Sequence, residues 1–464
     1  MGILASHDIK IMPYNVCPYE LEIVKEINEH ARVSFAALVP KGEQDKYIQM
    51  TESQTPIEIT HSDGTCLFKG IVINIKVKSV RDVFYLSAEG VSHTFNMDVK
   101  LKRRSFQNKD MKYTELIDEV IKEYSANYID AVSEGGTTSK FIIQYDETDW
   151  EFLKRMASHF NAGLVPDTYS NKPKIWFGTP EGKDKGKLEN YNYSVSKEIG
   201  QYRIASENYN KKIDEKDFIY YKIETEDLLN LGDSISFQNK KLYIYRSVSK
   251  LKNGVLIHEY TMAPENRLRQ DILYNEKIVG ASVEGKVIDI QEDNVRIHLD
   301  IDEKQNKDEA FWFPYSTFYT TEGETGWYCM PELEDRVKLY FPTKKEEEGI
   351  VLSSIRRRTK GGDFIKDPDV KIFRTKYGKE ILFAKDEIMI TGKDDEVLIR
   401  LIENEGIEIY SNKDIAVRAD KGLKIESGKN IEMSAGSKIS IKCKDSSIEM
   451  DGITAIKGKQ VKTN

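Results

Sequence analysis

Residues 407–441, IEIYSNKDIAVRADKGLKIESGKNIEMSAGSKISI, repeat one short pattern every eight residues. In each repeat a single residue separates two apolar ones, and polar residues with Gly, Asn, Asp or Ser fill the rest. A spacing of two is the period of a β-strand, and the polar residues are typical of turns. A helix is excluded because eight residues turn it by about 800°, so an apolar stripe would drift around it. The pattern therefore predicts short strands joined by turns.

The period of eight also limits how these strands are arranged. Left-handed single-chain β-helices repeat in hexapeptides, and right-handed ones use coils of about twenty residues or more, so eight residues fit neither. A repeat of eight residues fits one-third of a turn better. Three chains would then wind about one axis, with the apolar residues of every repeat inside. A generic β-solenoid of another stoichiometry is the alternative. We expect the trimer core of this needle to contain Ile407, Ile409, Ile415, Val417, Leu423, Ile425, Ile431, Met433, Ile439, Ile441 and, after a one-residue slip, Ile448 and Met450.

The composition is that of a globular chain of 464 residues, with 39% hydrophobic and 31% charged residues and a net charge of -8. Nucleic acids and anionic membranes bind basic patches, so neither partner is favoured. No segment approaches 18 uninterrupted apolar residues, and MGILASHDIK lacks the apolar stretch of a secretory signal. We expect cytoplasmic synthesis and assembly without stable membrane insertion. The four cysteines form no CxxC pair, so we expect reduced, mostly packed thiols.

Upstream of the repeats, residues 1–275 mix strands with two helices. Alternating apolar residues predict antiparallel strands at ELEIVKEI, RVSFAALV, GIVINIKVKSV and VFYLSAEGV. YTELIDEVIKEYS has helical apolar spacing, and Thr114 is its expected cap. DETDWEFLKRMASHFNAG predicts a second helix that Thr148 or Asp149 caps and Gly163 ends. Both are expected to be packing helices.

Between residues 1–275 and the repeats, five short strands alternate with polar turns: VEGKVIDI, NVRIHLDI, AFWFPYS, RVKLYFP and GIVLSSI. Five strands in about 75 residues suit a small barrel of the OB type, because closure removes unpaired edges. We therefore predict a mainly β protein with a few helices and three domains. They are an α+β domain at 1–275, an OB-fold domain at 276–358, and a linker with a triple-stranded β-helix at 359–464.

The sequence holds no recognised catalytic motif. HExxH, GxSxG, the Walker loop and GxGxxG are all missing, so we expect no enzyme activity, no catalytic or metal-binding residues and no cofactor. His159 lies near the end of a packing helix and is interpreted as structural. The carboxylates of DETDWE are explained by helix capping. IRRRTK is interpreted as a solvated linker, and the aromatic segment 311–328 as barrel core and contacts to neighbouring domains rather than a carbohydrate platform.

Three segments together resemble the VgrG family of central spike proteins, found in type VI secretion, contractile phage tails and R-type bacteriocins. RRSFQNKDMKYTELIDEVIKEY with IIQYDETDWEFLKRMASHFNAGLVPD is similar to the paired helices of the family's hub. GWYCMPELEDRVKLYFP with EEEGIVLSSI resembles the last strands of its OB domain, and the octads with ITAIKGKQVKTN resemble its needle and blunt tip. The segments follow the family's order over nearly the whole chain.

The resemblance implies a homotrimeric hub and spike that punctures a target envelope as part of a contractile injection machine. Its partners would be tube and baseplate proteins at the hub end and a PAAR-like tip protein at the C-terminal end. The tip protein would contact Ile456, Val461 and Asn464. The alternative is a tail-associated hydrolase of cell wall or polysaccharide.

The chain departs from the family pattern at one turn of the OB domain. Glu334 replaces the family's usual Gly before the Asp of that turn, so we expect a different turn conformation there.

Overall fold

The computed structural model describes residues 4–188, 192–208, 213–319, 325–355, 367–393, 396–450, 452–453 and 459–460. The chain divides into two compact units, Met1–Arg356 and Arg357–Asn464, and each is described by itself. Strands predominate in both and helices are few, which confirms the predicted mainly β class. Within the described ranges, no helix is both long and apolar enough to cross a membrane.

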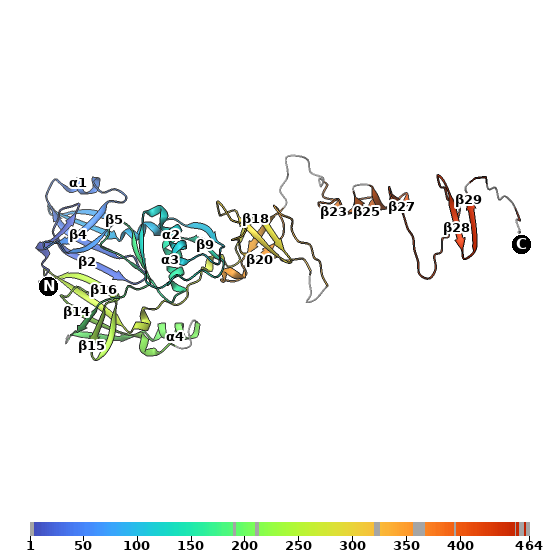
Figure 1. The fold of residues 1–464 in the computed structure, drawn as a ribbon. Helices are drawn as coiled ribbons and strands as arrows, with labels where there is room; N and C mark the ends of the chain where they lie inside the picture. The colour runs from blue at the N-terminus through green and yellow to red at the C-terminus, as the bar shows by residue number, and fades with distance from the viewer. Residues whose placement is uncertain are drawn as a thin grey trace. The chain divides into compact units, whose positions relative to one another are not determined.

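The first unit is built on a twelve-stranded sheet (Figure 1). Its main path runs β1-β4-β5-β6-β3-β2-β16-β17-β14-β13, and β15 adds to β16 and carries β12. The four strands predicted near the N-terminus are confirmed as β2, β3, β5 and β6. The bounds are β1 Ile9–Met12, β2 Pro18–Glu26, β3 Arg32–Val39, β4 Pro56–His61, β5 Cys66–Val80, β6 Val83–Val91, β12 Asp184–Lys187, β13 Tyr193–Lys197, β14 Ile219–Thr225, β15 Ser234–Phe237, β16 Lys240–Lys252 and β17 Val255–Ala263.

Two helices form a separate core beside this sheet. Their apolar faces pack on each other and on short strands, burying among others Leu116, Ile117, Trp150 and Leu153. The elements are α2 Tyr113–Ile121, α3 Asp149–Ser158, β7 Lys102–Phe106, β8 Asn127–Asp130, β9 Ile142–Glu147, β10 Leu164–Pro166 and β11 Lys174–Phe177. Both packing helices are therefore confirmed.

The caps of these helices follow the prediction only in part. The Thr148 hydroxyl accepts from the Glu151 N–H at 3.1 Å, so Thr148 caps α3 as expected. The prediction for α2 is wrong, because the helix begins at Tyr113 and Thr114 lies inside it. The Glu115 carboxylate instead accepts from the Lys112 N–H at 3.3 Å. Two further helices were not predicted, α1 Gln44–Gln49 and α4 Ile199–Asn208.

A five-stranded antiparallel sheet completes the first unit, in the order β20-β19-β18-β21-β22. The strands are β18 Ser282–Gln291, β19 Asn294–Leu299, β20 Trp312–Pro314, β21 Arg336–Tyr340 and β22 Ile350–Leu352, at the five predicted positions. Tyr315 bridges Val351, and the Ser316 N–H donates to the Val351 carbonyl at 2.8 Å, so the two outer strands meet. Glu334 has a φ of +72°, so it adopts the left-handed conformation that glycine favours.

The second unit contains an antiparallel meander, β23-β24-β25-β26-β27, and a hairpin of β28 and β29. The bounds are β23 Lys371–Arg374, β24 Glu380–Phe383, β25 Glu387–Lys393, β26 Val397–Ile402, β27 Gly406–Ser411, β28 Ile439–Cys443 and β29 Ser446–Met450. The described residues 412–438 belong to no strand of this single chain.

The four cysteines are free, but they are not mostly packed. Cys17, Cys329 and Cys443 are exposed and Cys66 is intermediate, so that part of the prediction is wrong. Two of the exposed thiols lie in loops, which sequence spacing alone does not distinguish from core positions. The predicted linker RRRTKGG, 356–362, lies outside the described residues.

Candidate assembly surface

The meander of the second unit carries an apolar face made of two cross-strand rows. The strand register aligns Phe373, Ile381, Ile390, Ile399 and Ile409 in one row, and Phe383, Ile388, Leu401 and Ile407 in the other. Each of these nine side chains is between 37% and 73% exposed. Directly opposed residues of an antiparallel pair point to the same side of the sheet, so the nine form one continuous surface, called here the apolar face.

The opposite side of the same meander combines charged pairs with apolar residues, namely Ile372, Leu382, Met389, Leu398 and Ile402. Arg400 binds Glu387 at 2.8 Å and Glu408 at 3.3 Å, and Arg374 binds Glu380 at 3.0 Å. Both sides of the sheet therefore carry apolar residues, but the nine of the apolar face are exposed, whereas the five on the opposite side are buried or intermediate. An apolar sheet face normally packs on a core.

The octads continue from the apolar face. Ile407 and Ile409, the first predicted pair, are the last members of the two rows. The next predicted residues, Ile415, Val417, Leu423, Ile425, Ile431 and Met433, are all more than half exposed. The last two pairs oppose one another in the β28–β29 hairpin, with Ile439 facing Met450 and Ile441 facing Ile448. The proposed tip contacts Ile456, Val461 and Asn464 lie outside the described residues.

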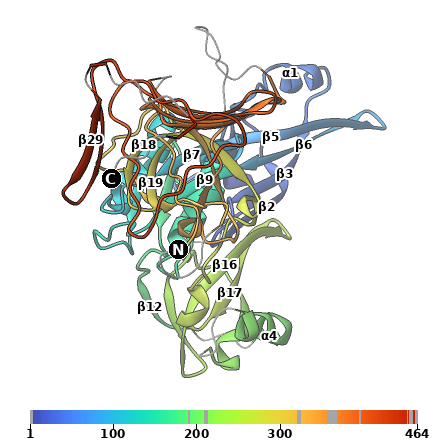
Figure 2. The same ribbon diagram turned by 90° about the vertical axis from the view of Figure 1, so that its right-hand side faces the viewer.

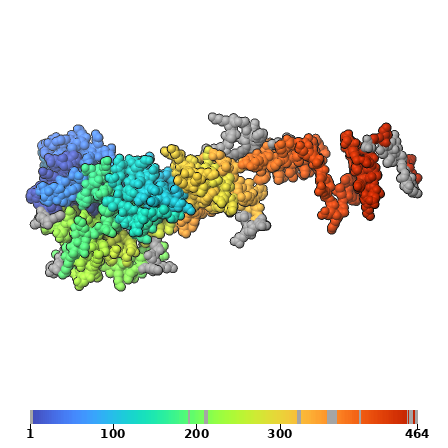
Figure 3. All heavy atoms as spheres, viewed as in Figure 1, coloured from blue at the N-terminus to red at the C-terminus, as the bar shows by residue number. Residues whose placement is uncertain are grey.

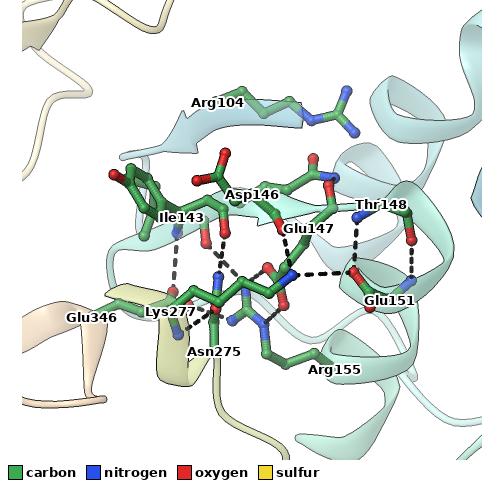
Figure 4. A network of polar contacts seen from close by, with 12 residues as sticks. Arg104, Ile143, Asp146, Glu147, Thr148, Glu151, Arg155, Asn275, Lys277 and Glu346 are labelled. Carbon is green, nitrogen blue, oxygen red and sulfur yellow. Dashed lines mark hydrogen bonds and ion pairs between the residues drawn. The ribbon is translucent and has the colours of Figure 1, made fainter. Parts of the chain in front are cut away.

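Within the first unit, a buried ionic cluster joins the helices to the five-stranded sheet (Figure 4). Arg155 of α3 donates from Nε and Nη2 to the two carboxylate oxygens of Glu147, at 2.8 and 2.7 Å. Its Nη1 donates to Glu346, which lies in the turn η7 (Glu346–Glu348) before β22. Glu346 also accepts from the Ile143 N–H at 3.0 Å. We call Arg155, Glu147 and Glu346 the ionic joint.

Neutral contacts surround the ionic joint. Phe141 and Ile143 pack in the core of the five-stranded sheet, where the Phe141 and Phe313 ring centroids are 4.9 Å apart. Asn275 donates to the Tyr145 carbonyl at 2.7 Å. In the space-filling view the helical region packs directly against the sheet region (Figure 3). The strand β9 therefore belongs to both cores at once, and the two regions are held as one body.

The charges of the ionic joint are almost completely removed from water, since all three side chains are less than a tenth exposed. Burial alone would lower the pKa of Arg155, but the carboxylates of Glu346 and Glu147 raise it. Burial raises the pKa of Glu346 in spite of the attraction to Arg155. Two carboxylates share one guanidinium here, so the arrangement depends on Arg155. Sequence reasoning missed this cluster, because Glu346 is 191 residues away from Arg155 and DETDWE was assigned to capping alone.

The remaining candidate residues have structural surroundings. The Tyr113 hydroxyl and His159 Nδ1 are 2.7 Å apart, and burial lowers the pKa of His159 to about 3, in keeping with its structural interpretation. Phe311 and Phe313 pack in the five-stranded core, whereas Phe318 and Tyr328 of the same aromatic segment are largely exposed. Over the described ranges, no group of three or more His, Cys, Asp or Glu side chains is placed to hold a metal ion.

The fold is that of hub-and-spike proteins from phage tails and type VI secretion. A component of the E. coli type VI secretion system, c3393, is described as structurally similar to the T4 bacteriophage tail proteins gp27 and gp5. It matches this chain with a TM-score of 0.55 at 14% identity, over 75% of this chain and 100% of that one. The half-lidded PdpA–VgrG complex of Francisella gives a TM-score of 0.54 at 11% identity, covering 86% and 87% of the two chains.

Sequence comparisons add less. The family described as Alg8 N-terminal domain matches residues 54–180, which is less than half of the chain. The search of curated proteins found no match. The likeness to the solved structures therefore shows the fold and confirms the predicted resemblance to VgrG-like spikes.

Proposed function

We propose that the chain is a structural hub-and-spike subunit of a contractile injection machine and works as a homotrimer without catalysis. The observation that carries the proposal is the apolar face, which ends in the first octad pair, Ile407 and Ile409, and leads into five further pairs with the same spacing. Full burial of a completely exposed apolar side chain is worth roughly 1.5–3 kcal/mol. Each of the nine side chains would gain the share of this that corresponds to its exposed fraction, between 37% and 73%. Three chains placed with these surfaces inward would enclose a shared core.

The proposed mechanism rests on shape and stiffness. A needle whose core is shared between chains resists buckling, because separating the chains exposes every octad together. The ionic joint would transmit axial load from the hub to the OB-like region without bending. Tube and baseplate proteins are the proposed partners at the hub end, and a PAAR-like tip protein is the proposed partner at the C-terminal end, on Ile456, Val461 and Asn464. The chain would be made in the cytoplasm and delivered through a target envelope.

Light scattering of the full chain, with and without residues 361–464, tests this proposal. We expect three times the mass of one chain, and a weakened oligomer after truncation. Leu423→Asp should prevent assembly, because it places three carboxylates at one level of an apolar core. Its neighbour Lys424 is exposed and would alternate to the other side of the proposed strand, so Lys424→Asp should leave the trimer intact. A monomeric full chain would contradict the proposed three-chain needle. A Leu423→Asp trimer that resists protease would show that Leu423 does not lie in its core.

A further inference from the structure

Two histidines and two aspartates gather where the N-terminal segment meets the turn between β4 and β5. His7 and Asp8 belong to the short turn η1 (Ser6–Asp8), which directly precedes β1. His61 is the last residue of β4, and Asp63 lies in the turn that follows. β1 pairs antiparallel with β4, and its first residue faces His61, so the pairing brings the two segments together.

The surroundings of His61 decide which of its ring nitrogens carries the proton. His61 Nδ1 lies 2.9 Å from a carboxylate oxygen of Asp63, and it donates to that oxygen. The Asp63 N–H also lies 3.4 Å from Nδ1, but the contact to the charged carboxylate is shorter and stronger. Hydrogen bonds from Thr65 and from His61 lower the pKa of Asp63 to about 2, so its carboxylate is ionised. A neutral His61 therefore carries its proton on Nδ1 and presents a lone pair on Nε2.

That lone pair has no hydrogen-bond donor in the described part of the chain. His61 Nε2 is removed from water and has no partner there. An oxygen of Asp8 lies 3.9 Å from His61 Nε2, and the same oxygen lies 3.4 Å from His7 Nε2. Two acceptors that face each other without a donor repel, so the arrangement calls for a positive charge between them. A proton or a metal ion can supply it.

We propose that His7, Asp8 and His61 bind a zinc ion, with Asp63 holding the His61 ring from behind. Imidazole nitrogen and carboxylate oxygen are ordinary zinc ligands, at about 2.0–2.2 Å from the metal, and in a tetrahedral site neighbouring ligand atoms are then about 3.4 Å apart. The two distances measured from Asp8, 3.4 and 3.9 Å, are close to this value. A carboxylate that accepts from the second nitrogen of a zinc-bound histidine is a recurrent feature of zinc sites.

Only His7 has to move for the site to form. Among the residues that the structure describes, no three such side chains already surround one point, so the metal-free arrangement is incomplete. The His7 side chain is 80% exposed, whereas that of His61 is 11% exposed and held by Asp63. Rotation of the His7 side chain can therefore bring its Nε2 to the open side of the ion. The sequence gave no sign of this site, because the two histidines lie far apart in the chain.

The zinc ion would fasten the N-terminal strand to the large sheet. Within the described ranges β1 ends the main path of that sheet, and β4 joins it to β5. β5 starts beside the proposed site and runs on into the β5–β6 hairpin, which Figure 2 shows extending away from the body of the sheet. The ligands do not converge in the unfolded chain, so zinc binding should raise the free energy of unfolding.

Equilibrium dialysis of the full chain against Zn²⁺, without a histidine tag, tests this assignment. The background has the four native cysteines replaced by serine, because Cys17 lies beside His7 and thiolates bind zinc. We expect one zinc ion per chain and a higher melting temperature when zinc is bound. His61→Gln should remove both effects. Asp63→Asn, which changes no ligand, should weaken zinc binding about 10–100-fold.

The matched control is His298→Gln, which removes a histidine of the five-stranded sheet and should leave zinc binding unchanged. X-ray absorption should show nitrogen and oxygen neighbours at about 2.0–2.2 Å from the zinc. Binding that survives His61→Gln, or equal losses in His61→Gln and His298→Gln, would overturn the site. No zinc binding by the folded parent chain would overturn it as well, since a proton would then be the cation between Asp8 and His61, and it would leave the proposed function standing.

Discussion

Replacing Arg155 by methionine should be one of the most damaging single changes in the first unit. Methionine fills a similar volume, so the main effect is electrostatic: two carboxylates, Glu147 and Glu346, are left buried without a cation. Breaking a buried pair in this way costs about 3–5 kcal/mol, a large share of the stability of a typical domain. We expect urea unfolding at pH 7, followed by tryptophan fluorescence, to show a loss of this size.

The matched variant is Glu346→Gln. It leaves Arg155 paired with Glu147 and keeps an oxygen for the Ile143 N–H, so the loss is that of one charged hydrogen bond, about 1–3 kcal/mol. The order of the two variants is the critical result. If Glu346→Gln were as damaging as Arg155→Met, the shared guanidinium would not be the centre of the joint.

The stability of the Arg155→Met variant should also depend on pH. Without Arg155, burial holds the pKa of the Glu346 carboxyl above that of the unfolded chain with no cation to oppose it. The folded variant then binds more protons than the unfolded chain, so its stability should rise as the pH falls from 7 towards the ordinary glutamate pKa. An Arg155→Met protein whose deficit is constant over that range would refute the electrostatic explanation.

Two further results are expected. Glu334→Gly should stabilise the first unit by about 1 kcal/mol in thermal unfolding, because an L-residue with φ of +72° is strained. Glu334→Ala, which loses the same exposed contact to Lys286 but keeps the strain, should give no gain. Burial lowers the pKa values of His159 and His258 to about 3 and about 4, so folding excludes their protons. Stability is full above the unfolded value near 6.5 and should fall as the pH drops towards 4, and His258→Gln should flatten that slope in melting curves.

Local patterns predicted local structure well. The Thr148 cap and the apolar stripe of α3 follow from neighbouring residues, and both are present. α4 was missed because its apolar residues do not gather on one side, and only Ala205 is buried. Thr114 failed as a cap because the helix begins one residue earlier, at Tyr113, and the Glu115 carboxylate accepts from the Lys112 N–H at its start.

The apolar face was predicted only in the part where the turns between its strands have a constant length. Ile407 and Ile409 were found because the octads begin there, whereas Phe373 and Ile390 belong to strands with unequal turns and show only alternation. The ionic joint depends on residues far apart in the chain. Pairing over such distances is decided by tertiary packing, and no local spacing encodes it.

The apolar face also has a consequence for the chain before assembly. A newly made copy presents nine aliphatic and aromatic side chains on one meander, and the described residues of its own chain leave each of them between 37% and 73% exposed. Such a surface adheres to any similar surface, so aggregation competes with correct association, and the balance depends on how many copies are present together. The same surface that would make a finished needle rigid would therefore expose the unassembled subunit to aggregation until its partner copies cover it.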